Sequence, residues 1–303
     1  MKRNYYILDV FTETAFAGNP LAVVRGAEGM SGERMQAVAH EFNLSETVFV
    51  LPSHDPVNTA RIRIFTPQRE LPFAGHPTIG TAVLIAQLDA PGLLSAQDLS
   101  VVLEEEVGNV ACTVAHRKGR APRASFQLPT EPKEVAIAPD DALIAAALGL
   151  EPDDIGFEKH FPTIWSAGLG FTFVPVRSME AIGRARPVMS CWANGVGPAD
   201  HPNAFLYTRD VAREGSAFHA RMFAPSMGVT EDPATGSAVA AFAGAIMQFE
   251  NPTDGNHVYV VEQGFEMGRP SLITLGIDVE ERQLVDASIG GAAVLVAQGT
   301  IDV

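Results

Sequence analysis

Apolar and polar positions alternate in short runs along much of the chain, which is the pattern of half-buried strands. Residues 61–65 are the plainest case, because arginine and apolar side chains take turns there. Other short runs are rich in β-branched and aromatic residues. They predict strands at 5–11, 21–24, 47–51, 101–103, 110–114, 125–128, 171–176, 204–207, 257–261, 272–275 and 292–297.

Four segments change to the period of a helix. Apolar residues at 35, 38, 39 and 42 predict an amphipathic helix over 32–42, with Ser31 as its N-cap and Asn43 at its end. Residues 140–148 predict a peripheral helix. Residues 79–86 and 238–247 are apolar on almost every side, which is typical of a helix buried all round.

The two buried helices belong to a motif that occurs twice. Residues 63–67 (RIFTP) return as 221–225 (RMFAP), and residues 76–82 (HPTIGTA) return as 232–238 (DPATGSA). Each copy has the pattern of strand, loop and helix start. Such self-similarity predicts two equivalent halves. We therefore expect an α+β fold of two pseudo-symmetric halves, each a curled, mostly antiparallel sheet or barrel around a central buried helix.

The repeat also suggests where the halves divide. We expect residues 1–120 to form the first half and 121–286 the second, linked by the proline-containing segment 122–132. Residues 287–303 have a strand pattern and are expected to return to the first half. A helix start attracts anions, so the cleft between two facing halves is the expected place for chemistry.

Composition narrows the class of protein. The 303 residues are 47% hydrophobic and 19% charged, a globular balance, and the net charge of −15 with only 21 Lys and Arg argues against a nucleic-acid partner. Cys112 and Cys191 are the two cysteines, which suits a reducing cytoplasm better than a disulfide framework. The apolar stretch near residue 7 is too short for a signal peptide or membrane span, so we expect a cytoplasmic location and no membrane partner.

The two helix starts carry the first candidate residues. Pro77 and Pro233 are expected at the first helical position, which places His76 and Asp232 at the N-caps. Aspartate is a common N-cap anywhere, so a purely structural role competes for Asp232. Histidine is not a preferred N-cap, and for His76 a functional role and a buried structural role both stay open.

Small and hydroxyl residues accompany them. Gly75 and Gly236 would allow a ligand to approach the backbone closely. Thr81 and Ser237 are matched hydroxyls that could bind a substrate carboxylate or, more commonly, their own backbone.

Glutamates supply the candidate acid/base groups. Glu46 follows the predicted helix end at Asn43; it is either a solvated glutamate or, if that corner turns into the cleft, a desolvated carboxylate with a raised pKa suited to proton transfer. The run of three glutamates at 104–106 is expected to be solvated surface without a role. The chain has no metal-ligand spacing and no dinucleotide fingerprint, so neither a metal nor a cofactor is expected.

Several motifs occur in a consistent order along nearly the whole chain: residues 18–20 (GNP), 43–46 (NLSE), 63–67, 70–77 (ELPFAGHP) and 231–238, followed by 263–264, 268–271 and 290–291. Together they resemble the PhzF-like family of phenazine-biosynthesis proteins. The resemblance implies the diaminopimelate epimerase-like fold, a homodimer, no cofactor, and an isomerase that moves a proton within a small carboxylated metabolite. It implies that Glu46 is the acid/base and that Gly75, His76, Asp232 and Ser237 hold and orient the substrate.

Two other functions stay open. Related epimerases carry a cysteine at each of two helix starts, but Cys112 and Cys191 lie outside both motifs, which disfavours a two-thiol racemase. An epimerase or racemase acting on an amino or hydroxy acid would need Glu46 with His76 or Asp232 as the opposed acid. A metabolite-binding protein without catalysis on the same scaffold is the third hypothesis.

Overall fold

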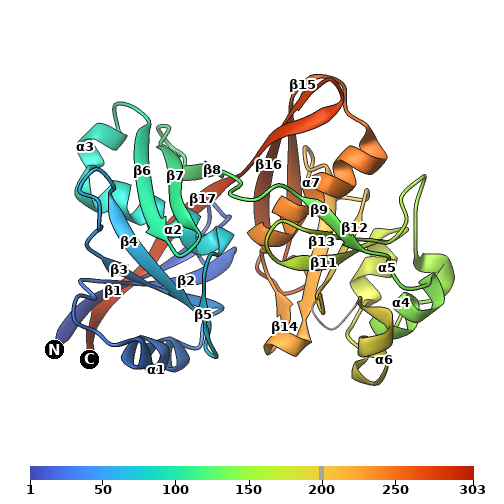
Figure 1. Cartoon of the computed structure of the whole chain (residues 1–303), viewed down its shortest axis with the longest axis horizontal. Coiled ribbons are helices and arrows are strands. Elements are labelled where there is room, and N and C mark those ends of the chain that lie inside the picture. The colour runs from blue at the N-terminus through green and yellow to red at the C-terminus, as the bar shows by residue number, and fades with distance from the viewer. Residues whose placement is uncertain (198–200) are drawn as a thin grey trace. The chain divides into compact units, whose positions relative to one another are not determined.

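The computed structural model describes residues 1–197 and 201–303, and Figure 1 labels its elements. It divides into two compact units, one of Met1–Pro129 with Gly290–Val303 and one of Thr130–Ile289. The division after Pro129 comes later than the boundary expected at 120. The expected linker at 122–132 contains β8 (Arg123–Gln127), which is a paired strand rather than a free connection.

Strands of the first unit close into a barrel. Two pairs of neighbouring strands are parallel, β2–β3 and β4–β6. The antiparallel pairs are β1–β2, β3–β4, β6–β7, β7–β8 and β1–β17. Strand β17 also pairs with β8, which completes the ring. A short strand, β5 (Glu70–Leu71), adds to β4. The remaining barrel strands are β1 (Lys2–Val10), β2 (Asn19–Arg25), β3 (Glu46–Leu51), β4 (Ala60–Phe65), β6 (Leu99–Glu105), β7 (Gly108–Ala115) and β17 (Gln283–Asp302).

The second unit repeats this plan. Its parallel pairs are β11–β12 and β13–β15, and β14 adds to β13 as β5 adds to β4. The pairs β9–β10, β10–β11, β12–β13 and β15–β16 are antiparallel. The strands are β9 (Lys133–Ala136), β10 (Thr163–Ser166), β11 (Gly170–Pro175), β12 (Ala204–Thr208), β13 (Phe218–Ala224), β14 (Val229–Asp232), β15 (Gly255–Gln263) and β16 (Ser271–Glu280).

One long helix lies at the centre of each unit. In the first unit α2 (Gly75–Asp89) is buried at every position from 75 to 86, and in the second α7 (Gly236–Glu250) is buried along most of its length. The strands approach so closely that a Cβ at Gly80 would lie 2.6 Å from Leu21 Cδ2, and one at Gly244 would lie 2.1 Å from the ring of Trp165. The expected fold of two barrels, each around a buried helix, is confirmed.

Shorter helices cover the outside of the strands. In α1 (Gly32–Phe42) the side chain of Ser31 accepts a hydrogen bond from Arg34 N at 3.2 Å, and Asn43 ends the helix in the left-handed region with φ 49°, both as expected. The helix expected over 140–148 forms as α4 (Asp141–Leu148); four of its side chains are buried in an apolar core and the other four are exposed, as in a peripheral helix. Patterning missed α3 (Pro91–Leu94), α5 (Met179–Arg184) and α6 (Met189–Gly195). No helix in the described ranges is long and apolar enough to cross a membrane.

Candidate active site

The helix starts differ from the sequence expectation. The N-cap of α2 is Ala74, in extended conformation, and His76 is the second helical residue. The N-cap of α7 is Thr235, and Asp232 is the last residue of β14. The prediction that His76 and Asp232 are N-caps is therefore wrong, because each helix begins at a glycine and not at a proline.

The turn that ends α1 places Glu46 near the start of α2. The left-handed turn at Asn43 reverses the chain, and Glu46 then opens β3 opposite Leu21 of the parallel strand β2. Leu21 itself follows a turn at Gly18, whose φ of +67° and 2.3 Å approach of an added Cβ to the Val10 carbonyl admit only glycine. Two of the motifs thus place their residues on neighbouring strands.

Glu46 and His76 come together in the first unit. His76 Nε2 lies 3.3 Å from Glu46 Oε2, with the His76 side chain 5% exposed and the Glu46 side chain 17% exposed. Burial lowers the pKa of His76 from 6.5 to about 3, so the imidazole is neutral at neutral pH. The pair is therefore a mostly buried carboxyl group beside a neutral ring. Gly75, the residue before His76, is also buried.

Asp232 belongs to a buried network before α7. The Thr235 hydroxyl donates to Asp232 Oδ2 at 2.6 Å. Gln263, fully buried on β15, donates from Nε2 to the Asp232 carbonyl at 2.7 Å and accepts from Thr235 N at 3.1 Å. Ser237 is the second residue of α7 and is half-buried. Sequence reasoning missed Thr235 as the N-cap and Gln263 as the residue that holds the turn, although residues 263–264 stood among the shared motifs.

A bidentate ion pair secures the loop that precedes each helix. Arg63 Nε and Nη2 each lie 2.6 Å from a Glu70 carboxylate oxygen, and the same atoms of Arg221 lie 2.8 and 2.9 Å from Glu231. Each guanidinium also stacks on the phenylalanine two residues later, at 5.1 Å in the first unit and 4.8 Å in the second. The doubled motif therefore forms the same bidentate Arg–Glu ion pair in both units, and we call each ion pair a clamp.

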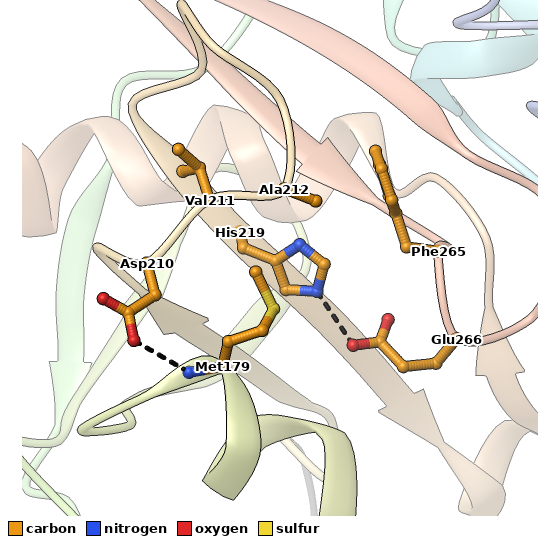
Figure 2. Close-up of a pocket in the computed structure, with 7 residues that line it drawn as sticks. All are labelled: Met179, Asp210, Val211, Ala212, His219, Phe265 and Glu266. Atoms are coloured by element: carbon orange, nitrogen blue, oxygen red, sulfur yellow. Dashed lines mark hydrogen bonds and ion pairs between the residues drawn. The ribbon is translucent and has the colours of Figure 1, made fainter.

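A cavity lies elsewhere, on the second unit (Figure 2). It has a volume of about 610 Å³, and His219 lies in its wall with one ring nitrogen 2.8 Å from Glu266 and the other 2.9 Å from Glu262. Its lining residues are Met179, Asp210, Val211, Ala212, His219, Phe265 and Glu266. None of the five residues predicted for the active site lines this cavity, so we do not assign the chemistry to it. In the described ranges no three His, Cys, Asp or Glu side chains are grouped to hold a metal ion.

Comparison with known proteins decides the family. The model of the phenazine biosynthesis-like protein family matches residues 8–299. The chain belongs to this family. A protein of Mesorhizobium japonicum named as an uncharacterized isomerase is 48% identical, over 99% of this chain and 98% of its own length. The trans-2,3-dihydro-3-hydroxyanthranilate isomerase of Pseudomonas aeruginosa is 34% identical, over 97% and 98%.

Solved structures agree with this assignment. The crystal structure of a PhzF-family phenazine biosynthesis protein from Bacillus anthracis matches with a TM-score of 0.89 and 26% identity, over the whole of both chains. The family resemblance and the fold predicted from the sequence are thus confirmed, and the chain is an enzyme of an isomerase family.

Proposed function

We propose that this enzyme moves a proton within a small carboxylated metabolite by acid/base catalysis at Glu46, without a cofactor. The observation that carries the proposal is the Glu46–His76 pair, a mostly buried carboxyl group 3.3 Å from a neutral imidazole. We further propose that Gly75, His76, Asp232 and Ser237 bind and orient the substrate.

The local chemistry supports a single carboxyl group that both removes and returns the proton. A partly desolvated carboxylate is a stronger base than a solvated one, and acid/base catalysis of this kind contributes roughly 10²–10⁴-fold in rate. The neutral ring of His76 can accept a hydrogen bond from substrate or steady the carboxyl, but it adds no positive charge that would weaken Glu46 as a base. Backbone N–H groups in the first turns of α2 and α7 are suited to a substrate carboxylate or a developing enolate-like charge.

The two cysteines favour this mechanism over thiol-based racemisation. Cys112 lies on β7, where burial raises the pKa of its thiol to about 12, and Cys191 lies on α6. Neither is at the start of α2 or α7, the positions that opposed thiol bases occupy in the related epimerases. An epimerase that uses Glu46 with a second, non-thiol acid is the remaining catalytic alternative.

Isotope exchange distinguishes these outcomes. The protein is incubated in D₂O with trans-2,3-dihydro-3-hydroxyanthranilate, the compound in the name of the 34% identical relative, and the product is analysed by NMR. Deuterium at a carbon other than the one that lost its proton supports isomerisation. Deuterium at the same carbon with inverted configuration would support an epimerase, and binding without any exchange would favour a metabolite-binding protein.

The state of the protein in solution follows as two further proposals. A homodimer, supported by the family resemblance, would have twice the chain mass of 32.3 kDa by light scattering. A reducing, cytoplasmic environment is supported by Cys112 and Cys191, which are both free thiols.

A further inference from the structure

The register of the strands identifies equivalent residues in the two units beyond the shared motifs. Arg61 of β4 pairs with Glu104 of β6, and His219 of β13 pairs with Glu262 of β15. The two glutamates make equivalent hydrogen bonds. Glu104 accepts hydrogen bonds from the backbone N–H groups of residues 54 and 55, and Glu262 accepts them from residues 212 and 213. The expectation that residues 104–106 are solvated is therefore wrong for Glu104, which is 8% exposed.

The next residue on each strand differs in chemistry. In the second unit it is Gln263, whose neutral amide holds the turn before α7. In the first unit it is Glu105, whose carboxyl is buried and lies 2.7 Å from the hydroxyl of Thr78 in the first turn of α2. An ionisable acid thus stands where the other unit has an amide.

Counting protons on the Thr78 hydroxyl assigns the state of Glu105. Thr78 Oγ1 also lies 2.8 Å from the Ala74 carbonyl, which can only accept. The hydroxyl has one proton, so if it donates to Ala74 the hydrogen bond to Glu105 requires a proton on the carboxyl group. The other oxygen, Oε2, has no hydrogen-bond partner in the described part of the chain. A buried carboxylate left so poorly solvated is costly, and burial raises the pKa of Glu105 from 4.5 to about 8.

In the described part of the chain no ion pair joins Glu105 to a cation, and no nearby positive charge lowers its pKa. Cys112 on β7, whose pKa is raised by burial and by the charge of Glu105, is a neutral thiol. On β4, Arg63 is engaged by Glu70. Glu105 shares a cavity of about 270 Å³ with His54, Arg61, Arg63, Glu70, Glu104 and Glu106, in which carboxylates accompany the cations.

We propose that Glu105 is a positioning residue whose neutral carboxylic acid, donating to Thr78 and through it to the Ala74 carbonyl, holds the first turn of α2 and thereby sets His76 against Glu46. This inference rests on the proposed function only for its effect on turnover. When Glu105 ionises, the Thr78 proton turns to the carboxylate and the Ala74 carbonyl loses its side-chain donor. The turn that carries Gly75 and His76 then loosens.

The test compares Glu105→Gln, which copies Gln263, with Glu105→Ala and with Glu106→Gln at the exposed neighbour. The kcat of the unchanged protein should fall about tenfold per pH unit above pH 8, as expected for loss of one proton. Glu105→Gln should keep the kcat of the unchanged protein at pH 7 and lose that alkaline decline. Glu105→Ala should lower kcat more than tenfold with little change in KM, and Glu106→Gln should leave the profile unaltered.

A measurement without turnover separates this inference from the proposed function. The ¹⁵N resonances of His76, assigned by their loss in His76→Gln, should shift between pH 7 and 9 in the unchanged protein and stay constant in Glu105→Gln. An alkaline decline and a His76 shift that both persist in Glu105→Gln would overturn the inference, whether or not Glu105→Ala folds. A His76 shift that disappears in Glu105→Gln, in a protein whose turnover survives Glu46→Gln, would overturn the proposed function alone.

Discussion

Replacing His219 by glutamine should destabilise the second unit in a way that depends on pH. His219 is 1% exposed and lies between Glu262, which is fully buried, and Glu266. Figure 2 shows His219 with Glu266. Burial alone would lower the pKa of His219, but hydrogen bonds to Glu262 and Glu266 outweigh it and raise the pKa to about 9. The imidazolium therefore offsets part of the negative charge of the two glutamates, and the His219→Gln variant lacks this positive charge.

The size of the effect follows from the pKa. A rise from 6.5 to about 9 corresponds to about 3 kcal/mol in favour of the folded, charged form. Because the folded pKa is the higher one, this stabilisation is complete below pH 6.5 and is lost as the pH rises through 9. His219→Gln should thus lower the free energy of unfolding by about 3 kcal/mol at pH 6 and by less than about 1 kcal/mol at pH 10.

Urea unfolding at the two pH values measures both differences. His40→Gln, at an exposed position on α1, is the matched control and should change the free energy of unfolding by less than about 0.5 kcal/mol. An equal loss at pH 6 and pH 10 in His219→Gln would show that packing, and not the charge of the imidazolium, accounts for the contribution of His219.

Three further changes test other parts of the structure. The free energy of unfolding of Glu105→Gln should rise relative to that of the unchanged protein by about 1.4 kcal/mol per pH unit between pH 4.5 and 8. The reason is that folded, unchanged protein retains a proton on Glu105 that its unfolded chain has lost. A constant difference between the two proteins in urea unfolding across this range would contradict a neutral Glu105. Arg221→Lys, at the buried clamp, should lower the free energy of unfolding by about 3 kcal/mol. Arg63→Lys, at the half-buried clamp, should lower it by about 1 kcal/mol. Equal losses would argue against a role for burial. Gly244→Ala should lower the free energy of unfolding by about 1–3 kcal/mol because the added methyl group clashes with Trp165. At the control position, Gly92→Ala, the methyl group meets open space and should not destabilise the protein. An unchanged thermal midpoint in Gly244→Ala would refute the close packing.

The architecture could be predicted because it depends on patterns that repeat. The doubled motif and the apolar helices at α2 and α7 indicated two halves, each around a buried helix, and the comparison with solved structures confirms that fold. The Ser31 cap and the Asn43 end of α1 are local signals, so they too were readable. Short helices such as α5 and α6 span only about two turns, and their stability comes from packing that no local pattern records.

The prolines misplaced both helix starts, and for α7 the reason is a contact remote in sequence. Pro77 and Pro233 suggested the first helical residue, but a hydrogen bond from Thr78 N to the Ala74 carbonyl begins α2 earlier, and Gln263 holds the chain so that α7 begins later. The bond to Gln263 joins residues that are 28 positions apart, so position within the motif does not determine where α7 begins.

The contact between Glu46 and His76 shows the same limit. Both residues were identified from motifs, but their 3.3 Å distance and the neutral state of His76 depend on the path from Asn43 to β3 and on burial of α2. Glu105 was missed because a run of three glutamates is usually solvated. The signal was present, since the 158-residue offset of the first repeated piece also carries residues 104–105 onto Glu262 and Gln263.

The central claim is that Glu46 transfers the proton, and the most direct measurement is turnover of trans-2,3-dihydro-3-hydroxyanthranilate by Glu46→Gln, with Glu41→Gln at an exposed site of α1 as the control. We predict that Glu46→Gln loses roughly 10²–10⁴-fold in kcat, while its affinity for the compound by calorimetry stays within about threefold and Glu41→Gln behaves as the unchanged protein. Full activity in Glu46→Gln would contradict the account.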